Sequence, residues 1–124
     1  ETVVLCSGKL YYDIEKAREA SPGKSESIAI VRVEQIAPFP KVFLTPFLNG
    51  FPKLKKVVWA QEEPQNMGAY QYVEPRLRKL MDELGLKKVD FEYIGRVERS
   101  SPAVGSIRVH GVEQNDIVTK CLNS

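Results

Sequence analysis

Three short, nearly continuous apolar runs, at residues 2–6, 28–33 and 57–60, constrain the fold of this chain more than any other feature. Each run is rich in β-branched residues and ends at polar, glycine or proline residues, a pattern typical of strands that are buried on both faces. A fourth run, at residues 90–95, places Phe91 and Tyr93 on one face. Buried strands of this kind are typical of a parallel sheet.

Helical patterns separate these runs. Leu10, Ile14 and Ala17 recur at the spacing of one helical face. Residues 41–48 predict a short or kinked helix, because Pro46 removes a backbone donor inside it. An apolar stripe from residue 73 to 84 predicts another helix, which either breaks at Pro75 or begins there. A last helix is expected at residues 112–122. The alternation predicts one three-layer α/β domain over residues 1–124, with a mostly parallel sheet.

Size and composition exclude several classes of protein. A chain of 124 residues, 43% hydrophobic and 27% charged, has the composition of one globular domain with one core. A net charge of +2 is too small to indicate binding to nucleic acid or to a membrane surface, and no apolar stretch is long enough to span a bilayer. We interpret Cys6 and Cys121 as buried, reduced thiols. A strand-like run at the first residues, without a starting methionine or a signal peptide, suggests a piece of a longer protein.

The motifs of common catalytic sites are missing. Residues 7–9 read Ser-Gly-Lys after a strand, but Val3 and Leu10 stand where a phosphate-binding loop needs glycine and a hydroxyl residue. We therefore predict a tight strand-to-helix turn there. The sole histidine, His110, lacks the partners of a nucleophilic triad, and two separated cysteines do not complete a zinc site. These absences favour a binding or assembly domain over an enzyme.

The candidate functional residues follow the third strand. In open α/β sheets, ligands bind beyond the carboxyl ends of the strands, where a polar loop is expected here. Adjacent carboxylates in an extended segment point to opposite faces, so Glu62 and Glu63 make a poor acid–base pair. They could instead cap the next helix, form a salt bridge or contact a ligand. Arginines suit anion recognition. The candidate effector or interface residues are Gln61, Glu62, Glu63, Gln65, Asn66, Arg76 and Arg96.

An ordered set of motifs resembles one known family. The set includes Ser-Gly-Lys at 7–9, Pro-Phe-Pro at 38–40, Gln-Glu-Glu-Pro at 61–64 with Asn66 and Gly68, and residues 95–96 and 101–105 with His110. Together they resemble the C-terminal domain of the thiamine-diphosphate-dependent first component of the 2-oxoglutarate dehydrogenase complex. Gln65 and Met67 are closer to the 2-oxoadipate branch of that family, so the 2-oxo acid stays open. Other open alternatives are another transketolase-superfamily domain and a free-standing nucleotide-binding module.

The resemblance implies a fold and an activity for the parent enzyme. The implied fold is a five-stranded, mostly parallel sheet of the transketolase C-terminal type with one reversed strand, and residues 106–109 could supply the fifth strand. The implied enzyme, part of the tricarboxylic acid cycle, decarboxylates a 2-oxo acid on thiamine diphosphate with magnesium and acylates a lipoyl group. Those cofactors would bind in the preceding domains, so the resemblance implies no cofactor and no catalysis in this domain alone.

The resemblance also implies partners. Similar domains help to form a homodimer, work beside the dihydrolipoyl acyltransferase component, and in some members carry an effector site for AMP or acetyl-CoA. The implied compartment is the mitochondrial matrix in a eukaryote and the cytoplasm in a bacterium.

Overall fold

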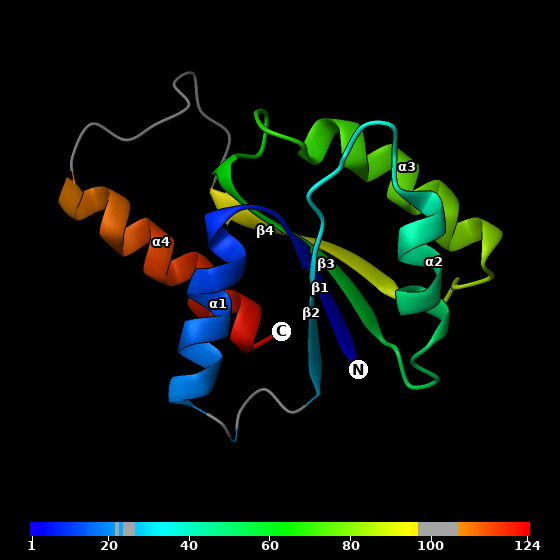
Figure 1. The fold of residues 1–124 in the computed structure, drawn as a ribbon, viewed down its shortest axis with the longest axis horizontal. Coiled ribbons are helices and arrows are strands. Elements are labelled where there is room, and N and C mark those ends of the chain that lie inside the picture. The colour runs from blue at the N-terminus through cyan, green and yellow to red at the C-terminus, as the bar shows by residue number, and fades with distance from the viewer. Residues whose placement is uncertain (22, 24–26, 97–106) are drawn as a thin grey trace.

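A computed structural model describes residues 1–21, 23, 27–96 and 107–124. Strands and helices alternate along the described chain (Figure 1). In order they are β1 (Thr2–Cys6), α1 (Lys9–Ala20), β2 (Ile28–Arg32), α2 (Lys41–Asn49), β3 (Lys56–Pro64), α3 (Tyr70–Glu83), β4 (Asp90–Arg96) and α4 (Ile107–Leu122).

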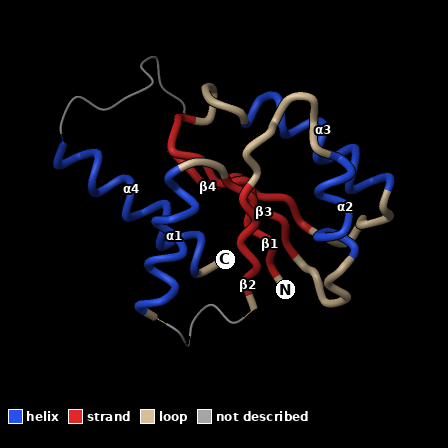
Figure 2. Tube along the Cα trace, viewed as in Figure 1, coloured by secondary structure: helices blue, strands red, loops and turns tan. Residues whose placement is uncertain are grey.

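The described strands form one parallel sheet in the order β2-β1-β3-β4 (Figure 2). In β1, Thr2 lies between Ile28 of β2 and Lys56 of β3. The register of β3 and β4 is regular up to the pair Ala60 and Ile94, then shifts so that Pro64 pairs with Arg96. Strand β3 therefore carries more residues than β4 over this stretch, and the irregularity coincides with the polar residues that follow Ala60.

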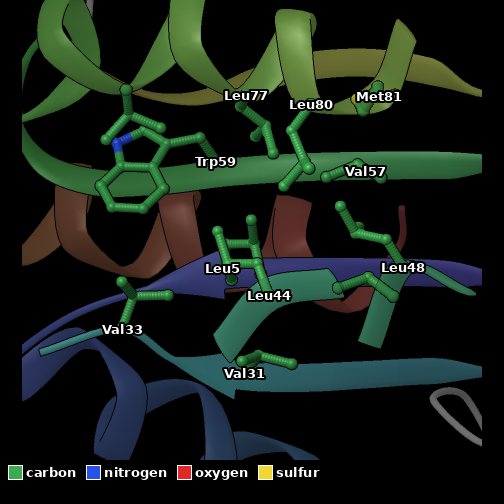
Figure 3. Packing of buried hydrophobic residues seen from close by; sticks show 12 residues of the cluster. Leu5, Val31, Val33, Leu44, Leu48, Val57, Trp59, Leu77, Leu80 and Met81 are labelled. Atoms are coloured by element: carbon green, nitrogen blue, oxygen red, sulfur yellow. The ribbon is translucent and has the colours of Figure 1, made fainter. Parts of the chain in front are cut away.

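Helices cover both faces of the sheet, with α2 and α3 on one side and α1 and α4 on the other (Figure 1). Because side chains alternate along a strand, Val57 and Trp59 enter the core under α2 and α3, while Val58 and Ala60 enter the core under α1 and α4. Figure 3 shows the first core, where Trp59 lies near Leu77 of α3. The predicted three-layer α/β architecture is confirmed.

The expected fifth strand is not among the described elements. The structure describes four strands, all parallel, so the reversed strand implied by the resemblance is not one of them. Residues 107–109, proposed as that strand, form the first turn of α4. An alternation of apolar and polar residues over four positions is too short to separate a strand from a helix. Further along, Ile117 and Cys121 are buried at the spacing of one helical face, which favours a helix over a strand for this segment.

Two proline expectations had different outcomes. Helix α2 is short, as expected, with Pro46 inside its nine residues. Helix α3 begins at Tyr70 and passes through Pro75 without a break, so the expected break or start at that proline was wrong. Pro75 and Gln71, whose carbonyl loses its helical donor, are both exposed, so water can bond to that carbonyl.

Candidate functional site

Strand β3 continues through the polar residues that were expected to form a loop. It ends at Pro64, so Gln61, Glu62 and Glu63 are strand residues. Gln61 points to the side of Trp59 and α3, whereas Glu62 points to the side of α1 and α4. The prediction that neighbouring side chains in an extended segment face opposite ways is thus confirmed. The prediction of a loop starting at residue 61 was wrong, because the sheet supplies pairing partners that the sequence does not show.

Gln61 is a buried hydrogen-bonding centre, with only 4% of its surface exposed. Its Oε1 accepts hydrogen bonds from the indole Nε1 of Trp59 at 2.9 Å and from the backbone N–H of Tyr70 at 3.0 Å. Its Nε2 donates to the carbonyls of Pro64 at 2.9 Å and Met67 at 2.8 Å, with a longer contact to the Glu63 carbonyl. Both ends of the amide are therefore engaged, and Gln61 fixes the turn between β3 and α3.

The end of β4 approaches β3 too closely for a side chain at Gly95. A Cβ at this position would lie 2.3 Å from the Tyr93 hydroxyl and 2.9 Å from the Gln61 carbonyl. The Tyr93 hydroxyl donates to the Arg96 carbonyl at 2.7 Å and also lies 3.2 Å from the Glu63 carbonyl. Burial raises the pKa of Tyr93 to about 12, so the phenol stays neutral and keeps the proton that it donates.

On the opposite face, polar side chains of α4 join the ends of two strands. Gln114 donates from Nε2 to the carboxylate of Glu62 at 2.7 Å and to that of Asp13 in α1 at 3.0 Å. Arg96 and Glu113 form an ion pair at 2.9 Å, with side chains 6% and 21% exposed. Sequence reasoning missed Glu113 and Gln114. Gln114 contacts residues 52 and 101 positions away along the chain, and no local pattern reports such distances.

The seven candidate residues do not form one cluster. Gln61 lies on the α3 face, and the Glu63 side chain lies against Gly68 in the turn before α3. Glu62 and Arg96 lie toward α4. The turn after β3 holds Gln65 and Asn66, and the backbone N–H of Gln65 donates to the Arg96 carbonyl at 3.1 Å.

Arg76 lies apart, on the exposed side of α3, with its guanidinium 3.7 Å from the centre of the Tyr72 ring. His110 falls in α4, and its side chain lies outside the part of the chain that the structure describes.

A second polar cluster, which sequence reasoning missed, lies at the ends of β1 and β2. The Glu34 carboxylate accepts a hydrogen bond from the Gly8 backbone at 3.1 Å and pairs with Arg32 at 2.5 Å. Arg32 also donates to the Tyr12 hydroxyl at 2.7 Å. The hydrogen bond from Arg32 holds the pKa of Glu34 below its ordinary value. Gly8, at φ 65°, makes the predicted tight strand-to-helix turn.

An exposed apolar surface adjoins this second cluster. Val42 is 88% exposed, and Tyr12 and Phe43 are about half exposed. A hollow of about 420 Å³ separates α2 from the end of β2 and is lined by Arg32, Glu34 and Phe43, among others. We call Tyr12, Arg32, Val42 and Phe43 the β2–α2 patch. Aromatic and arginine side chains at a surface are the composition that protein interfaces favour.

The cofactors implied by the resemblance can be compared with these residues. Among the described residues, no three His, Cys, Asp or Glu side chains gather as metal ligands would. The carboxylates of Asp13 in α1 and Glu62 in β3 are bridged by Gln114. The described residues therefore offer no cluster of carboxylates for a metal ion.

Two further sequence interpretations concern the thiols and the membrane. Cys6 and Cys121 are free and buried in the core under α1 and α4, as interpreted. Burial raises the pKa of each thiol to about 12, which keeps both protonated at neutral pH. None of the helices in the described ranges is long and apolar enough to cross a bilayer.

The fold and its contacts define a three-layer α/β domain whose polar groups gather at the carboxyl ends of parallel strands. The chain belongs to the family described as 2-oxoglutarate dehydrogenase C-terminal, whose family model matches residues 1–122. It is similar to proteins named "2-oxoglutarate dehydrogenase E1 component" from Rickettsia felis, at 40% identity, and Bacillus licheniformis, at 44%. Each alignment covers 97% of this chain but 12% of the relative, so the chain spans about an eighth of their length. The resemblance drawn from the motifs is confirmed.

Proposed function

We propose that this chain is the C-terminal domain of a 2-oxoglutarate dehydrogenase E1 component and helps to hold an E1 homodimer together. In this proposal the parent enzyme uses thiamine diphosphate and magnesium, bound elsewhere, to decarboxylate a 2-oxo acid oxidatively. It passes the succinyl group to the lipoyl group of the dihydrolipoyl acyltransferase component, and the present domain catalyses nothing alone. The support is the family membership and the shared name of the relatives, whose much longer chains contain this region.

The β2–α2 patch carries the assembly role. Contiguous apolar surface at the rim of a hollow is characteristic of interaction sites, and single exposed apolar residues are not. Here Val42 and Phe43 are consecutive exposed residues of α2. Phe43 and Arg32 line the same hollow, and Arg32 donates a hydrogen bond to the Tyr12 hydroxyl. We assign the corresponding surface of a second copy as the occupant, because an isologous contact is the commonest way for identical chains to pair.

Sedimentation velocity of the full-length chain tests this role. We expect Phe43→Glu to weaken the dimer by about 30-fold, which corresponds to the loss of ~2 kcal/mol at an interface hot spot. Phe51→Glu is the matched control, because Phe51 is another exposed aromatic residue, 39% accessible, outside the patch. An unchanged dimer in Phe43→Glu, or an equal loss in both variants, would refute the assignment.

The proposed substrate is 2-oxoglutarate rather than 2-oxoadipate. The names of the relatives support it. Gln65 and Met67, which suggested the second acid, lie in the turn after β3, and the Met67 carbonyl accepts a hydrogen bond from Gln61. That bond uses the backbone of residue 67, so it fixes the turn whatever side chain stands there. The ratio of kcat/KM for the two acids, measured on the full-length enzyme, checks this, and a preference for 2-oxoadipate would reverse it.

Regulation by AMP or acetyl-CoA is the second part of the proposal. Its support is that Gln65 and Asn66, in the turn after β3, lie beside Arg96 at the end of β4, where the Gln65 N–H donates to the Arg96 carbonyl. An anion that binds Arg96 has to displace Glu113 from its guanidinium. Because such binding needs the guanidinium, Arg96→Ala should abolish binding of either compound in calorimetric titrations. Unchanged binding in that variant would exclude Arg96. The relatives named above are bacterial, which favours the bacterial cytoplasm over a mitochondrion as the proposed compartment.

A further inference from the structure

A pocket between α2 and α3 has the chemistry of a binding site that is separate from the strand ends. It has a volume of about 270 Å³, and Phe39, Lys41, Tyr72, Arg76, Lys79 and Glu83 contribute to its lining. We propose that this pocket binds a small planar anion, namely a single ring that carries one phosphate or carboxylate group. The proposal goes beyond the assembly role, because none of these residues belongs to the β2–α2 patch.

The charges of the lining favour an anion. Three cationic side chains, Lys41, Arg76 and Lys79, face one acidic side chain, Glu83. Lys41 and Glu83 form an ion pair at 2.5 Å that joins α2 to α3. The pKa of Glu83 lies below its ordinary value, chiefly because Lys41 donates a hydrogen bond to it, and Lys79 adds to the effect. The pocket thus already stabilises one carboxylate and retains an excess of positive charge.

Arg76 is held in a position suited to binding. Its guanidinium stacks at 3.7 Å from the centre of the Tyr72 ring, and its Nη1 donates to the Tyr72 carbonyl at 2.8 Å. A guanidinium fixed in this way loses less conformational freedom when it binds a ligand than a freely moving lysine does. Its planar arrangement of donors also matches two oxygens of a carboxylate or phosphate at once.

Apolar side chains and size select the rest of the ligand. Phe39 packs against the core under α2 and α3, and Leu80, 2% exposed, forms the floor of the pocket. An aromatic wall beside a stacked guanidinium favours a flat ring. Sites for drug-sized molecules have volumes of about 300–1,000 Å³, so a smaller pocket suits one ring better than coenzyme A.

Calorimetric titration of the full-length chain with phenyl phosphate, benzoate and inorganic phosphate tests the proposal. We expect phenyl phosphate or benzoate to bind in the millimolar range or tighter, and inorganic phosphate to bind at least tenfold more weakly. Arg76→Gln should weaken binding of the ring-bearing anion at least tenfold. Arg78→Gln is the matched control, because Arg78 lies two residues further along α3, pairs with Glu74 and lies outside this pocket.

Several results would overturn the proposal. Equal affinity in Arg76→Gln and the parent chain would show that the ligand binds elsewhere. Equal affinity for inorganic phosphate would remove the role of the ring, and no binding of either ring-bearing anion would remove the site. Lys79→Gln, compared by circular dichroism with the parent chain, provides a second variant if Arg76→Gln fails to fold. Sedimentation of the same samples reports the dimer independently, so the two proposals fail separately.

Discussion

Replacing Gln61 with methionine should destabilise the fold, because this residue satisfies polar groups in the core. Methionine has nearly the same length and volume, so Gln61→Met removes hydrogen bonds with little change in packing. The variant leaves the Trp59 indole N–H, in a side chain 1% exposed, without its acceptor. It also removes the acceptor of the Tyr70 N–H at the start of α3 and the donor to the Pro64 and Met67 carbonyls.

The magnitude follows from burial. An unsatisfied buried donor costs about 1–3 kcal/mol, and the Trp59 N–H belongs near the top of that range. Tyr70 is half-buried, so water can reach the region of its backbone N–H. Leaving this N–H without its acceptor therefore costs less than leaving the Trp59 indole N–H without one. Carbonyls tolerate a lost donor better than N–H groups tolerate a lost acceptor. We expect the free energy of unfolding to fall by ~3 kcal/mol in total. For a domain of this size, the melting temperature should fall by about 10 °C.

Urea unfolding followed by far-ultraviolet circular dichroism measures this change. Gln65→Met is the control, because Gln65 is exposed and lies four residues away on the same segment. It should change the stability by less than about 0.5 kcal/mol, as most surface substitutions do. Trp59 is the sole tryptophan, so its fluorescence reports the same site directly. A loss below about 1 kcal/mol in Gln61→Met would refute the reasoning that Gln61 organises this end of the sheet.

Three further predictions concern other sites. Gly95→Ala should destabilise the fold by about 2 kcal/mol, since the new methyl group meets the Tyr93 hydroxyl, and thermal melting measures this. Arg32→Ala should raise the pKa of Glu34 in an NMR titration, and an unchanged pKa would contradict the ion pair. Because folding lowers the pKa of Glu34, the ionised carboxylate stabilises the fold at pH values above its unfolded pKa. This stabilisation disappears as the pH falls through the folded pKa, so the stability of Arg32→Ala should depend less on pH. Cys6 should react with thiol reagents only after unfolding, since it is buried and its pKa is about 12, and rapid labelling of the folded chain would contradict this.

Strand positions were more predictable than strand ends. The apolar runs at β1, β2 and the first half of β3 were correctly read as strands, because burial on both faces leaves a local trace in the composition. The polar second half of β3, from Gln61 onward, carries no such trace. It is strand because β4 lies beside it, and that neighbour is some thirty positions away in the chain.

The candidate residues show the same division. Gln61 and Glu62 were expected in a loop just past the third strand, whereas both lie within β3 near its carboxyl end. Their partners were not anticipated. Gln61 binds Trp59 and the backbone of the following turn, and Glu62 binds Gln114 of α4. A glutamine that holds a turn in place and a glutamine that binds a ligand have the same local sequence context.

The amino-acid sequence alone determined the class of fold, the order of its helices and buried strands, and the family, because each is encoded in periodicity or in short motifs. The tertiary structure alone decided which face each candidate occupies, which charges pair and where cationic and apolar side chains meet. Arg96 pairs with Glu113, and Arg76 lies instead in a pocket with Phe39 and Lys41. The reason is physical: hydrogen bonds and ion pairs act over a few ångströms in space, and only folding brings residues distant in the chain within that range.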